Sequence, residues 1–236
     1  MRRFVDLHLK PPFHDMKVVE RMACLAAEVG FHLVGLTFDF RTTREVRASA
    51  VKLFEDQGLT VMARIDLRPK SKYDLLRSLR DVRMLFDIVA VECSNTQVSS
   101  VAFRDRRVDL VFFPVGRLQS RLSWLIPKKL KRPVELNIAD LLRNDSSSES
   151  DLVRAINLIS DAQRKHMPLV ASSGATDLFS LRAPRDMAAV LSVLGLESSS
   201  AVSAVSDRPY SMIQRNLERR EPDFISDGIR MVRRRT

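Results

Sequence analysis

The sequence predicts an α/β fold, a TIM-like (β/α)8 barrel followed by a short basic C-terminal segment. Short apolar runs rich in Val, Ile, Leu and Phe recur eight times along the 236 residues. Helical patterns with apolar residues at three- and four-residue spacing lie between most of them. Right-handed crossovers make parallel closure the simplest topology for such a series. An open doubly wound sheet is the main alternative, but it usually has a Gly-rich turn after its first strand, and here that turn reads LKPPFHD.

The expected elements follow the chain in order. Strands are expected at residues 4–9, 32–38, 60–67, 87–93, 109–115, 133–138, 168–172 and 200–206. Helices are expected at residues 16–30, 43–58, 73–86, 150–166 and 184–196, and Gly30, Gly58 and Gly195 fit C-terminal caps after three of them. The polar run 144–151 predicts a loop. We therefore expect a barrel over residues 1–220 and a basic tail over residues 221–236.

Composition indicates a soluble protein with a polyanionic partner. The chain has 39 Lys and Arg against 29 Asp and Glu, a net charge of +10 and a pI near 10.2. Nucleic acid is the simplest partner for such an excess. A membrane surface could also attract it, but no apolar run approaches the ~18 residues needed to span a bilayer. Cys24 and Cys93 belong to no ligand-spaced cluster, which favours a reducing cytosol over a disulfide scaffold or a structural zinc.

In a barrel, function is expected on the loops that follow the strands. The DLH at the end of the first strand resembles the HxH of the polymerase-and-histidinol-phosphatase metallohydrolases, with Asp6 in place of the first histidine. The other nitrogen ligands that such metal clusters need are missing, because the chain has only four histidines. A metal-dependent phosphoesterase stays an alternative, and its candidate ligands would be Asp6, His8, Asp39, Asp66 and Glu92.

The stretch 168–186, PLVASSGATDLFSLRAPRD, combines a buried strand with small residues and then arginines. No GxSxG surrounds Ser172 and Ser173, so we expect them to pack a strand end, and no catalytic residue is predicted. Pro184 fits the first turn of a helix, and Arg182 and Arg185 flank that helix N-terminus, which favours an anion. A barrel enzyme that binds a phosphate of a small substrate there is a second alternative.

Basic residues are not confined to that loop. They recur in RDRR at 104–107, at Arg117 and Arg121, in PKKLKR at 127–132, in QRKH at 163–166 and in the RMVRRR of the tail. Dispersed clusters of this kind indicate several contacts to backbone phosphates. One Trp and two Tyr give no stacking platform for single-stranded bases, so recognition of a folded RNA by shape and phosphate is expected.

Seven segments together resemble one known family. They are FVDLHL, GFHLVGLTFDF, FDIVAVECSN, RRVDLVFFPVGR, PVELNIADLLR, PLVASSGATDLFSLRAPRDMAAVLSVLGL and AVSAVSDRPYSMIQRN, spanning residues 4 to about 219. In this order they are similar to the archaeal ribonuclease P protein component 3 family, homologues of the thirty-kilodalton subunit of eukaryotic RNase P. The resemblance implies a TIM-like barrel that lacks the metal set of the related metallohydrolases, and so binds no cofactor of its own.

The resemblance also implies a role. The RNA subunit of RNase P and its magnesium ions would cleave the 5′ leader from precursor tRNA, while this cytoplasmic, non-catalytic protein would bind that RNA and pair with protein component 2 among the other RNase P proteins. By matching position, Arg182 carries the arginine of the LR.P pattern, and Arg104, Arg107 and Arg117 flank the fifth strand. The expected RNA-binding residues are Arg104, Arg107, Arg117, Lys128, Lys129, Arg182 and Arg185.

Overall fold

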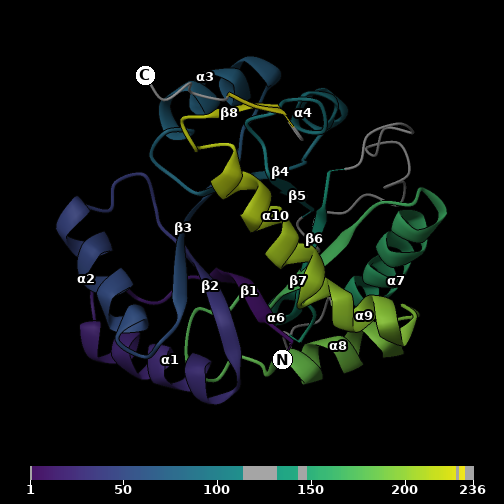
Figure 1. The fold of residues 1–236 in the computed structure, drawn as a ribbon. Helices are drawn as coiled ribbons and strands as arrows, with labels where there is room; N and C mark the ends of the chain where they lie inside the picture. Colours follow the sequence, from purple (N-terminus) through teal and green to yellow (C-terminus); the bar gives the residue numbers. More distant parts are fainter. Residues whose placement is uncertain (1, 114–131, 143–147, 227–228, 232–236) are drawn as a thin grey trace.

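The computed structural model describes residues 2–113, 132–142, 148–226 and 229–231 of the chain. In these ranges, seven parallel strands follow one another in a single sheet in the order of the sequence. The strands are β1 (Phe4–Leu9), β2 (Phe31–Thr37), β3 (Thr60–Leu67), β4 (Ile88–Glu92), β5 (Leu110–Phe112), β6 (Val134–Asn137) and β7 (Leu169–Ser172). The sheet curls into a barrel with helices around its outside (Figure 1), so the predicted TIM-like fold is confirmed.

Most helices connect one strand to the next. They are α1 (Met16–Glu28), α2 (Arg44–Glu55), α3 (Lys72–Val82), α4 (Thr96–Ala102), α6 (Ile138–Leu141), α7 (Ser148–Arg164), α8 (Pro184–Val193), α9 (Ser198–Ala204) and α10 (Asp207–Glu218). Gly30, Gly58 and Gly195 have φ of +94°, +78° and +98°, as expected of residues that end helices. Because α7 begins at Ser148, the loop predicted over 144–151 is wrong in its last four residues, and residues 144–147 lie outside the described ranges.

The two edges of the sheet approach each other at the carboxyl ends of the strands. Leu9 and Ala175 form a parallel bridge, and the amide of Lys10 donates to the carbonyl of Ala175 at 2.8 Å. At the other end of β1, the amide of Val5 donates to the carbonyl of Val205 at 2.9 Å. The gap between β7 and β1 is therefore closed by loop and helix backbone, where a complete barrel would have its eighth strand.

The eighth strand predicted at 200–206 is wrong, because Ser198–Ala204 form helix α9. In SAVSAVS the apolar residues also recur every three residues, and this spacing buries Ala201 and Ala204 on one helical face. Glu197 completes the helix start, since its carboxylate accepts from the amides of Ser199 and Ser200 at 2.9 and 3.0 Å. A capped helix satisfies more backbone donors than an isolated strand at this edge could.

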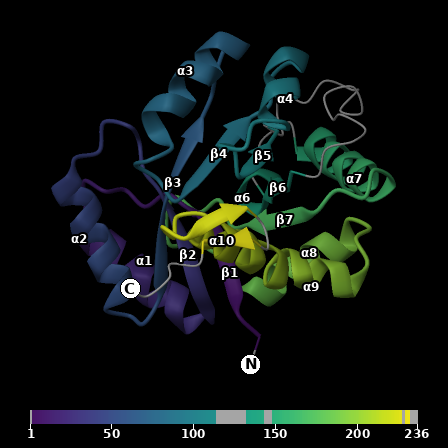
Figure 2. The same ribbon diagram turned by 45° about the horizontal axis from the view of Figure 1, so that its top comes forward.

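Helix α10 seals the end of the barrel at which the strands begin. Met212 and Ile213 of α10 pack with the inward-facing apolar residues Val5, Leu7, Leu33, Met62, Ile88, Ala90, Leu110, Phe112 and Val170. Figure 2 shows α10 lying across the strands, inside the ring of outer helices. A second and larger apolar layer lies between the outer faces of the strands and the surrounding helices. The open end of the barrel is consequently the one at which the strands finish.

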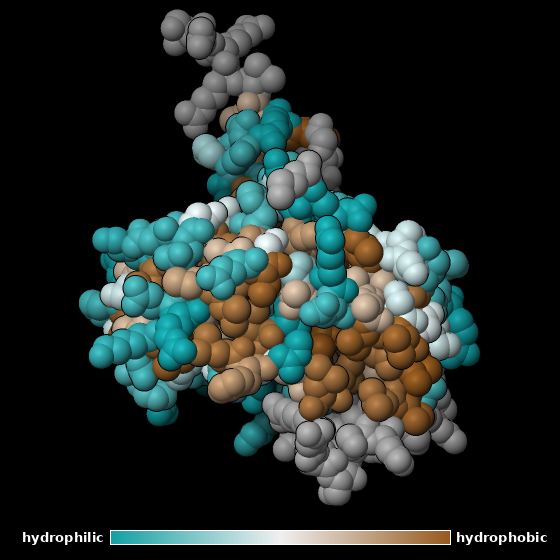
Figure 3. Space-filling model, turned by 90° about the horizontal axis from the view of Figure 1, so that it is seen from below, coloured by the Kyte–Doolittle hydropathy of each residue, from teal (hydrophilic) through white to brown (hydrophobic). Residues whose placement is uncertain are grey.

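The outer surface is unevenly covered. Seen from below, where α1 and α8 lie, hydrophobic areas are separated by hydrophilic side chains (Figure 3). Val193 on α8 and Phe179 in the preceding loop are the most exposed apolar side chains of this part of the chain, at 87% and 89%. No helix in the described ranges is long and apolar enough to cross a membrane.

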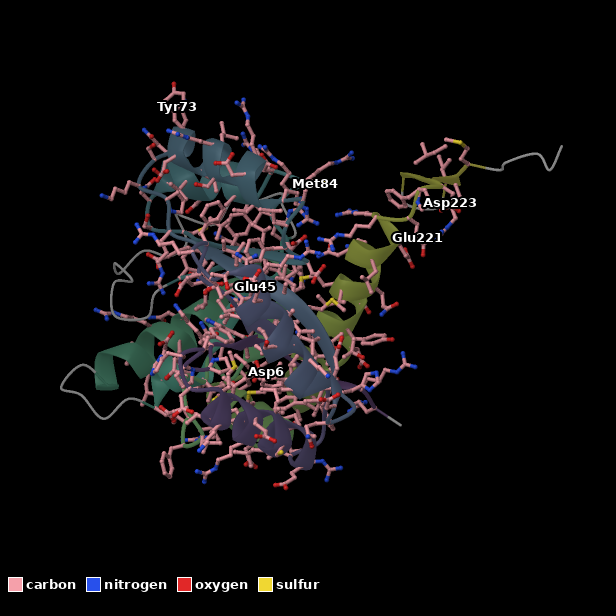
Figure 4. The ribbon with its side chains drawn as sticks, turned by 90° about the vertical axis from the view of Figure 1, so that its left-hand side faces the viewer. Asp6, Glu45, Tyr73, Met84, Glu221 and Asp223 are labelled. Carbon is pink, nitrogen blue, oxygen red and sulfur yellow. The ribbon has the colours of Figure 1, made fainter. Side chains whose placement is uncertain are left out.

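The segment after α10 extends away from the barrel. Figure 4 shows Glu221 and Asp223 on this extension, and Asp6 within the barrel. Two short strands, β8 (Phe224–Ser226) and β9 (Ile229–Arg230), pair antiparallel in it. The boundary of a separate tail at residue 221 stays a prediction.

Candidate nucleic-acid interface

A buried arginine occupies the polar centre of the barrel. Arg64 of β3 has no exposed side-chain surface, and its two terminal nitrogens each donate to a different oxygen of Glu135 on β6, both at 2.6 Å. Its Nε donates to Asp66 at 2.7 Å. Burial alone would raise the pKa of Glu135 and of Asp66, but Arg64 holds both below their usual values. The centre of the barrel is thus filled by ion pairs within the protein.

A glycine makes this arrangement possible. Arg64 also donates to the carbonyl of Leu7 on β1, at 3.0 Å. A Cβ at Gly35 on β2 would lie 2.3 Å from that same carbonyl oxygen. Only glycine therefore leaves the Leu7 carbonyl free to turn toward the guanidinium.

His8 lies above the arginine, at the mouth of the barrel. Its Nδ1 is 2.9 Å from Oδ1 of Asn137, and its Nε2 is 3.3 Å from Oδ2 of Asp66. The side chains of His8 and Asp66 are 13% and 11% exposed, so this layer meets the solvent only at its upper edge. It forms the floor of the mouth.

Of the candidate metal ligands, the structure brings His8 and Asp66 within 3.3 Å of each other, but the other three have different partners. Asp6 accepts from the amides of Ser173 and His8, Asp39 pairs with Lys10 at 3.1 Å, and Glu92 pairs with Arg68 at 3.3 Å. In the described ranges, no group of three or more His, Cys, Asp or Glu side chains is placed to hold a metal ion. The permanent charge of Arg64 beside Glu135 and Asp66 further opposes a divalent cation there. The residues present do not fit the metal centre of a phosphoesterase.

Ser172 and Ser173 have structural partners. The hydroxyl of Ser172 donates to Glu135 at 2.6 Å, and the hydroxyl of Ser173 accepts from the amide of Ala175 at 3.2 Å. Both residues are fully buried, in agreement with the expected packing of a strand end. Burial also raises the pKa of neighbouring Asp6 to about 6, although hydrogen bonds from Ser173 and His8 oppose the shift.

Arginines gather at the opposite, sealed end of the barrel. A groove of about 750 Å³ is lined by Arg83, Arg106, Arg219 and Arg220 together with Met84, Phe224 and Ile225. We call it the arginine groove. Figure 4 shows Met84 at the edge of the barrel that faces the extension carrying Glu221, with side-chain nitrogens between them. Each arginine comes from a segment that ends a helix, because the αβ turns of a parallel barrel all meet at this end.

Two of these arginines form ion pairs with aspartates that lie outside the lining of the groove. Arg83 pairs with Asp109 at 2.5 Å, and Arg220 pairs with Asp87. The described lining of the groove itself holds four arginines and no acidic side chain. The pKa of Arg132, which lies nearby, is lowered first by burial and then by the like charges of Arg219 and Arg83. This end of the barrel is an anion-attracting surface.

The predicted RNA-binding residues around β5 differ in how available they are. Arg104 is exposed, beside the groove residue Arg106 in the α4–β5 turn. Arg107 is instead held by Asp105, to which its Nε and Nη2 donate at 2.9 and 2.7 Å. The hydrogen bonds that Arg107 donates to Asp105 raise the pKa of Arg107. The predicted residues Arg117, Lys128 and Lys129 lie outside the described ranges.

Arg182 and Arg185 lie at the other end of the barrel, by the start of α8. Pro184 occupies the first turn of α8 as predicted, and Ala183 makes no side-chain cap. Arg182 is half-buried and donates to the carbonyl of Leu181 at 2.9 Å and to that of Phe179. Arg185 is exposed. Arg182 therefore shapes the loop, whereas Arg185 faces solvent.

The four groove arginines, Arg83, Arg106, Arg219 and Arg220, were absent from the predicted set, although Arg106 belongs to the RDRR cluster. The structure places each of them after a helix, at the end of the barrel where the strands begin. The expectation that function lies after the strands directed attention to the other end. A comparison of the number of basic residues in the αβ turns with the number in the βα loops could have found them.

The fold and the site together define a class of protein: a TIM-like barrel with an ion-paired centre, closed at one end by a helix, and with a cationic groove at that same end. The family model described as RNase P subunit p30 matches residues 3–221. The chain belongs to the RNase P subunit p30 family, which confirms the resemblance found in the sequence.

Curated relatives cover nearly the whole chain. It is 23% identical to ribonuclease P protein component 3 of Methanothermobacter thermautotrophicus, with 98% of this chain and 96% of that protein covered. It is 26% identical to ribonuclease P protein component 3 of Methanosarcina barkeri, with 94% and 97% covered. A chain in the cryo-EM structure of archaeal ribonuclease P with mature tRNA matches with a TM-score of 0.77 at 16% identity, covering 98% of this chain and 99% of that one, and this likeness shows the shared fold.

Proposed function

We propose that this chain is a protein subunit of ribonuclease P that binds the RNA subunit and stabilises it in the form that removes the 5′ leader from precursor tRNA. Membership of the p30 family and relatives named ribonuclease P protein component 3 support this role. The observation that carries the proposal on the protein itself is the arginine groove, whose described lining holds four arginines and no acidic side chain.

The groove suits an RNA backbone for chemical reasons. Guanidinium groups donate pairs of parallel hydrogen bonds to phosphate oxygens, and they carry charge at every physiological pH. Arginines from three separate turns span more surface than one small phosphate ester needs. Arg104 continues this surface, and the predicted contacts of Arg107, Arg117, Lys128 and Lys129 stay proposals. Arg185 would add a phosphate contact at the other end of the barrel, with Arg182 positioning its loop.

The direct test measures affinity for the RNA subunit as salt is varied. Each phosphate contact adds about 0.9 to the negative slope of log K against log salt concentration. We expect Arg104→Ala with Arg106→Ala to weaken binding and to reduce that slope by about 2. Arg21→Ala is the matched control, because Arg21 is an exposed arginine on α1. Equal slopes for the double variant and the control would contradict the assignment of the groove to RNA.

We further infer that bond cleavage is done by the RNA subunit with its magnesium ions, and that this chain pairs with protein component 2 in a cytoplasmic complex. The engaged carboxylates at the barrel centre support a non-catalytic role for this protein. Elemental analysis of protein purified without chelator should find no stoichiometric zinc or manganese. A bound metal at one equivalent, lost together with cleavage when His8 is replaced by Ala, would favour the phosphoesterase instead.

A further inference from the structure

A cavity of about 340 Å³ opens at the mouth of the barrel, away from the arginine groove. Its walls come from the carboxyl ends of β1, β2 and β3 and from α3, and they include His8, Lys10, Thr37, Phe40, Asp66 and Arg68. Barrels bind their ligands at this end, and this volume falls in the range of small-molecule sites.

The floor of the cavity is rigid. His8 and Asp66, both nearly buried, form it at 3.3 Å from each other, and Arg64 fixes Asp66 from below at 2.7 Å. The single positive charge of Arg64 is shared by Asp66 and Glu135, so the floor keeps one net negative charge and offers a carboxylate that accepts hydrogen bonds. Such a surface suits the part of a ligand that donates hydrogen bonds and carries no negative charge.

One buried polar group in the wall has no partner. The Oγ1 atom of Thr37 has no hydrogen-bond partner in the described ranges, although the residue is only 2% exposed. A buried hydroxyl without a partner is destabilising and therefore rare unless it has another use. Thr37 ends β2 directly beside the cavity, where it could both donate to and accept from a ligand.

The rim combines an aromatic face with two cationic side chains. Phe40 is 59% exposed, while Phe38 is buried against Phe13. Lys10 and Arg68 also line the cavity. Lys10 forms an ion pair with Asp39, and Arg68 forms one with Glu92. Surface ion pairs are weak and open readily, so these cations can turn toward an incoming phosphate.

We propose that this cavity binds a single unpaired nucleobase together with its ribose. A base has a flat apolar face, for which Phe40 is the available ring, and an edge with both donors and acceptors, for which Thr37 and Asp66 are available. Lys10 and Arg68 would meet the flanking phosphates. A site for one base is compatible with the scarcity of aromatic residues, which argued only against an extended stacking platform. The inference rests on the proposed RNA-binding function and adds a second kind of contact to it.

The test uses the full-length protein with methyl-labelled side chains, observed by NMR. Titration with adenosine, cytidine, guanosine and uridine 5′-monophosphates should produce saturable shifts at the methyl groups of Ile65, Leu67 and Val82, which line the cavity. We expect Phe40→Ala and Thr37→Val each to weaken this binding at least fivefold. Phe179→Ala is the matched control, since Phe179 is also an exposed phenylalanine but lies in the β7–α8 loop.

The outcomes separate this inference from the proposed function. If the monophosphates leave the cavity methyls unchanged while RNA still binds with a steep salt slope, the cavity proposal is overturned and the arginine groove stands. A zwitterionic amino acid is titrated in parallel. If it shifts the cavity methyls in a saturable way and none of the nucleotides does, the cavity proposal is also overturned. A short single-stranded RNA should compete with the monophosphates, and failure to compete would exclude an RNA nucleotide as the occupant.

Discussion

At the level of single residues, the ion pairs of Arg64 are the most consequential contacts in the barrel. The guanidinium and the carboxylate of Glu135 are both fully buried, so neither can exchange its partner for water. Burial of one charge without the other costs several kcal/mol, whereas the intact pair is near neutral in its net contribution.

Glu135→Gln should therefore lower the free energy of unfolding by about 3–5 kcal/mol. Urea denaturation of the two proteins measures this difference. Glu218→Gln, at an exposed position on α10, is the control and should change stability by no more than about 0.5 kcal/mol. A similar effect of both substitutions would mean that the buried pair is not structurally important.

Asp6 should make stability depend on pH. Its folded pKa is about 6, above the usual value of 3.8, so the folded state binds the proton more tightly than the unfolded chain does. The contribution is present below about pH 4 and is lost as the pH rises through about 6, by about 3 kcal/mol for a shift of this size. Unfolding measured from pH 4 to pH 7 should show this loss in the natural protein. Asp6→Asn should abolish that part of the slope, and an unchanged slope would contradict the assignment.

Thr37→Val should stabilise the free protein by about 1 kcal/mol, because it replaces a buried hydroxyl that has no partner in the described ranges by a methyl group. Differential scanning calorimetry would detect the rise in melting temperature. A rise in stability together with a loss of nucleotide binding would identify the hydroxyl as retained for binding. A fall in stability would show instead that Thr37 has a structural partner in solution.

At the level of elements, helix α10 takes the place of part of the missing barrel closure. Its inward residues Met212 and Ile213 join the interior apolar cluster, and Asn216 donates to the carbonyl of Asp87 at 3.4 Å. The helix starts at Asp207 and has Pro209 in its first turn, where the missing N–H of proline costs no hydrogen bond. Nothing in its periodicity showed that it would cross the end of the barrel, because that depends on the absent eighth strand.

Ile213→Ala should destabilise the protein by about 2–5 kcal/mol, since it leaves a cavity in the sealed end. Leu217→Ala on the same helix removes a side chain that is 38% exposed and should cost much less. Thermal unfolding followed by circular dichroism compares the two. Equal losses would indicate that α10 lies on the barrel surface and does not seal it.

At the level of the whole molecule, the fold was predictable and much of the site was not. Seven of the expected strands and the cap glycines followed from local patterns, which act over a few residues. The predicted eighth strand was wrong because the apolar spacing of SAVSAVS fits both a strand and a helix, and the cap by Glu197 favours the helix. The arginine groove depends on which turns meet in space, as does the pairing of Arg64 with Glu135 across 71 residues. Single-sequence patterns do not contain that information.

Removal of residues 222–236 tests the boundary predicted between barrel and tail. We expect the shortened chain to keep its melting temperature within a few degrees, because α10 and the Arg220–Asp87 pair remain. Its affinity for RNA should fall, since the deletion takes four arginines against two aspartates. Anisotropy titrations at several salt concentrations measure the loss. A large drop in melting temperature would place the tail within the folded core.

The end of α10 connects the seal of the barrel to the arginine groove. Ile213 closes the interior, and Arg219 and Arg220 line the groove less than two helical turns later. An RNA that binds these arginines would also hold α10 against the barrel. RNA binding and local unfolding of α10 would therefore oppose each other. Amide hydrogens of α10 should then exchange more slowly in the complex than in the free protein. Binding of RNA would in this way raise the free energy needed to open α10 above its value in the isolated subunit.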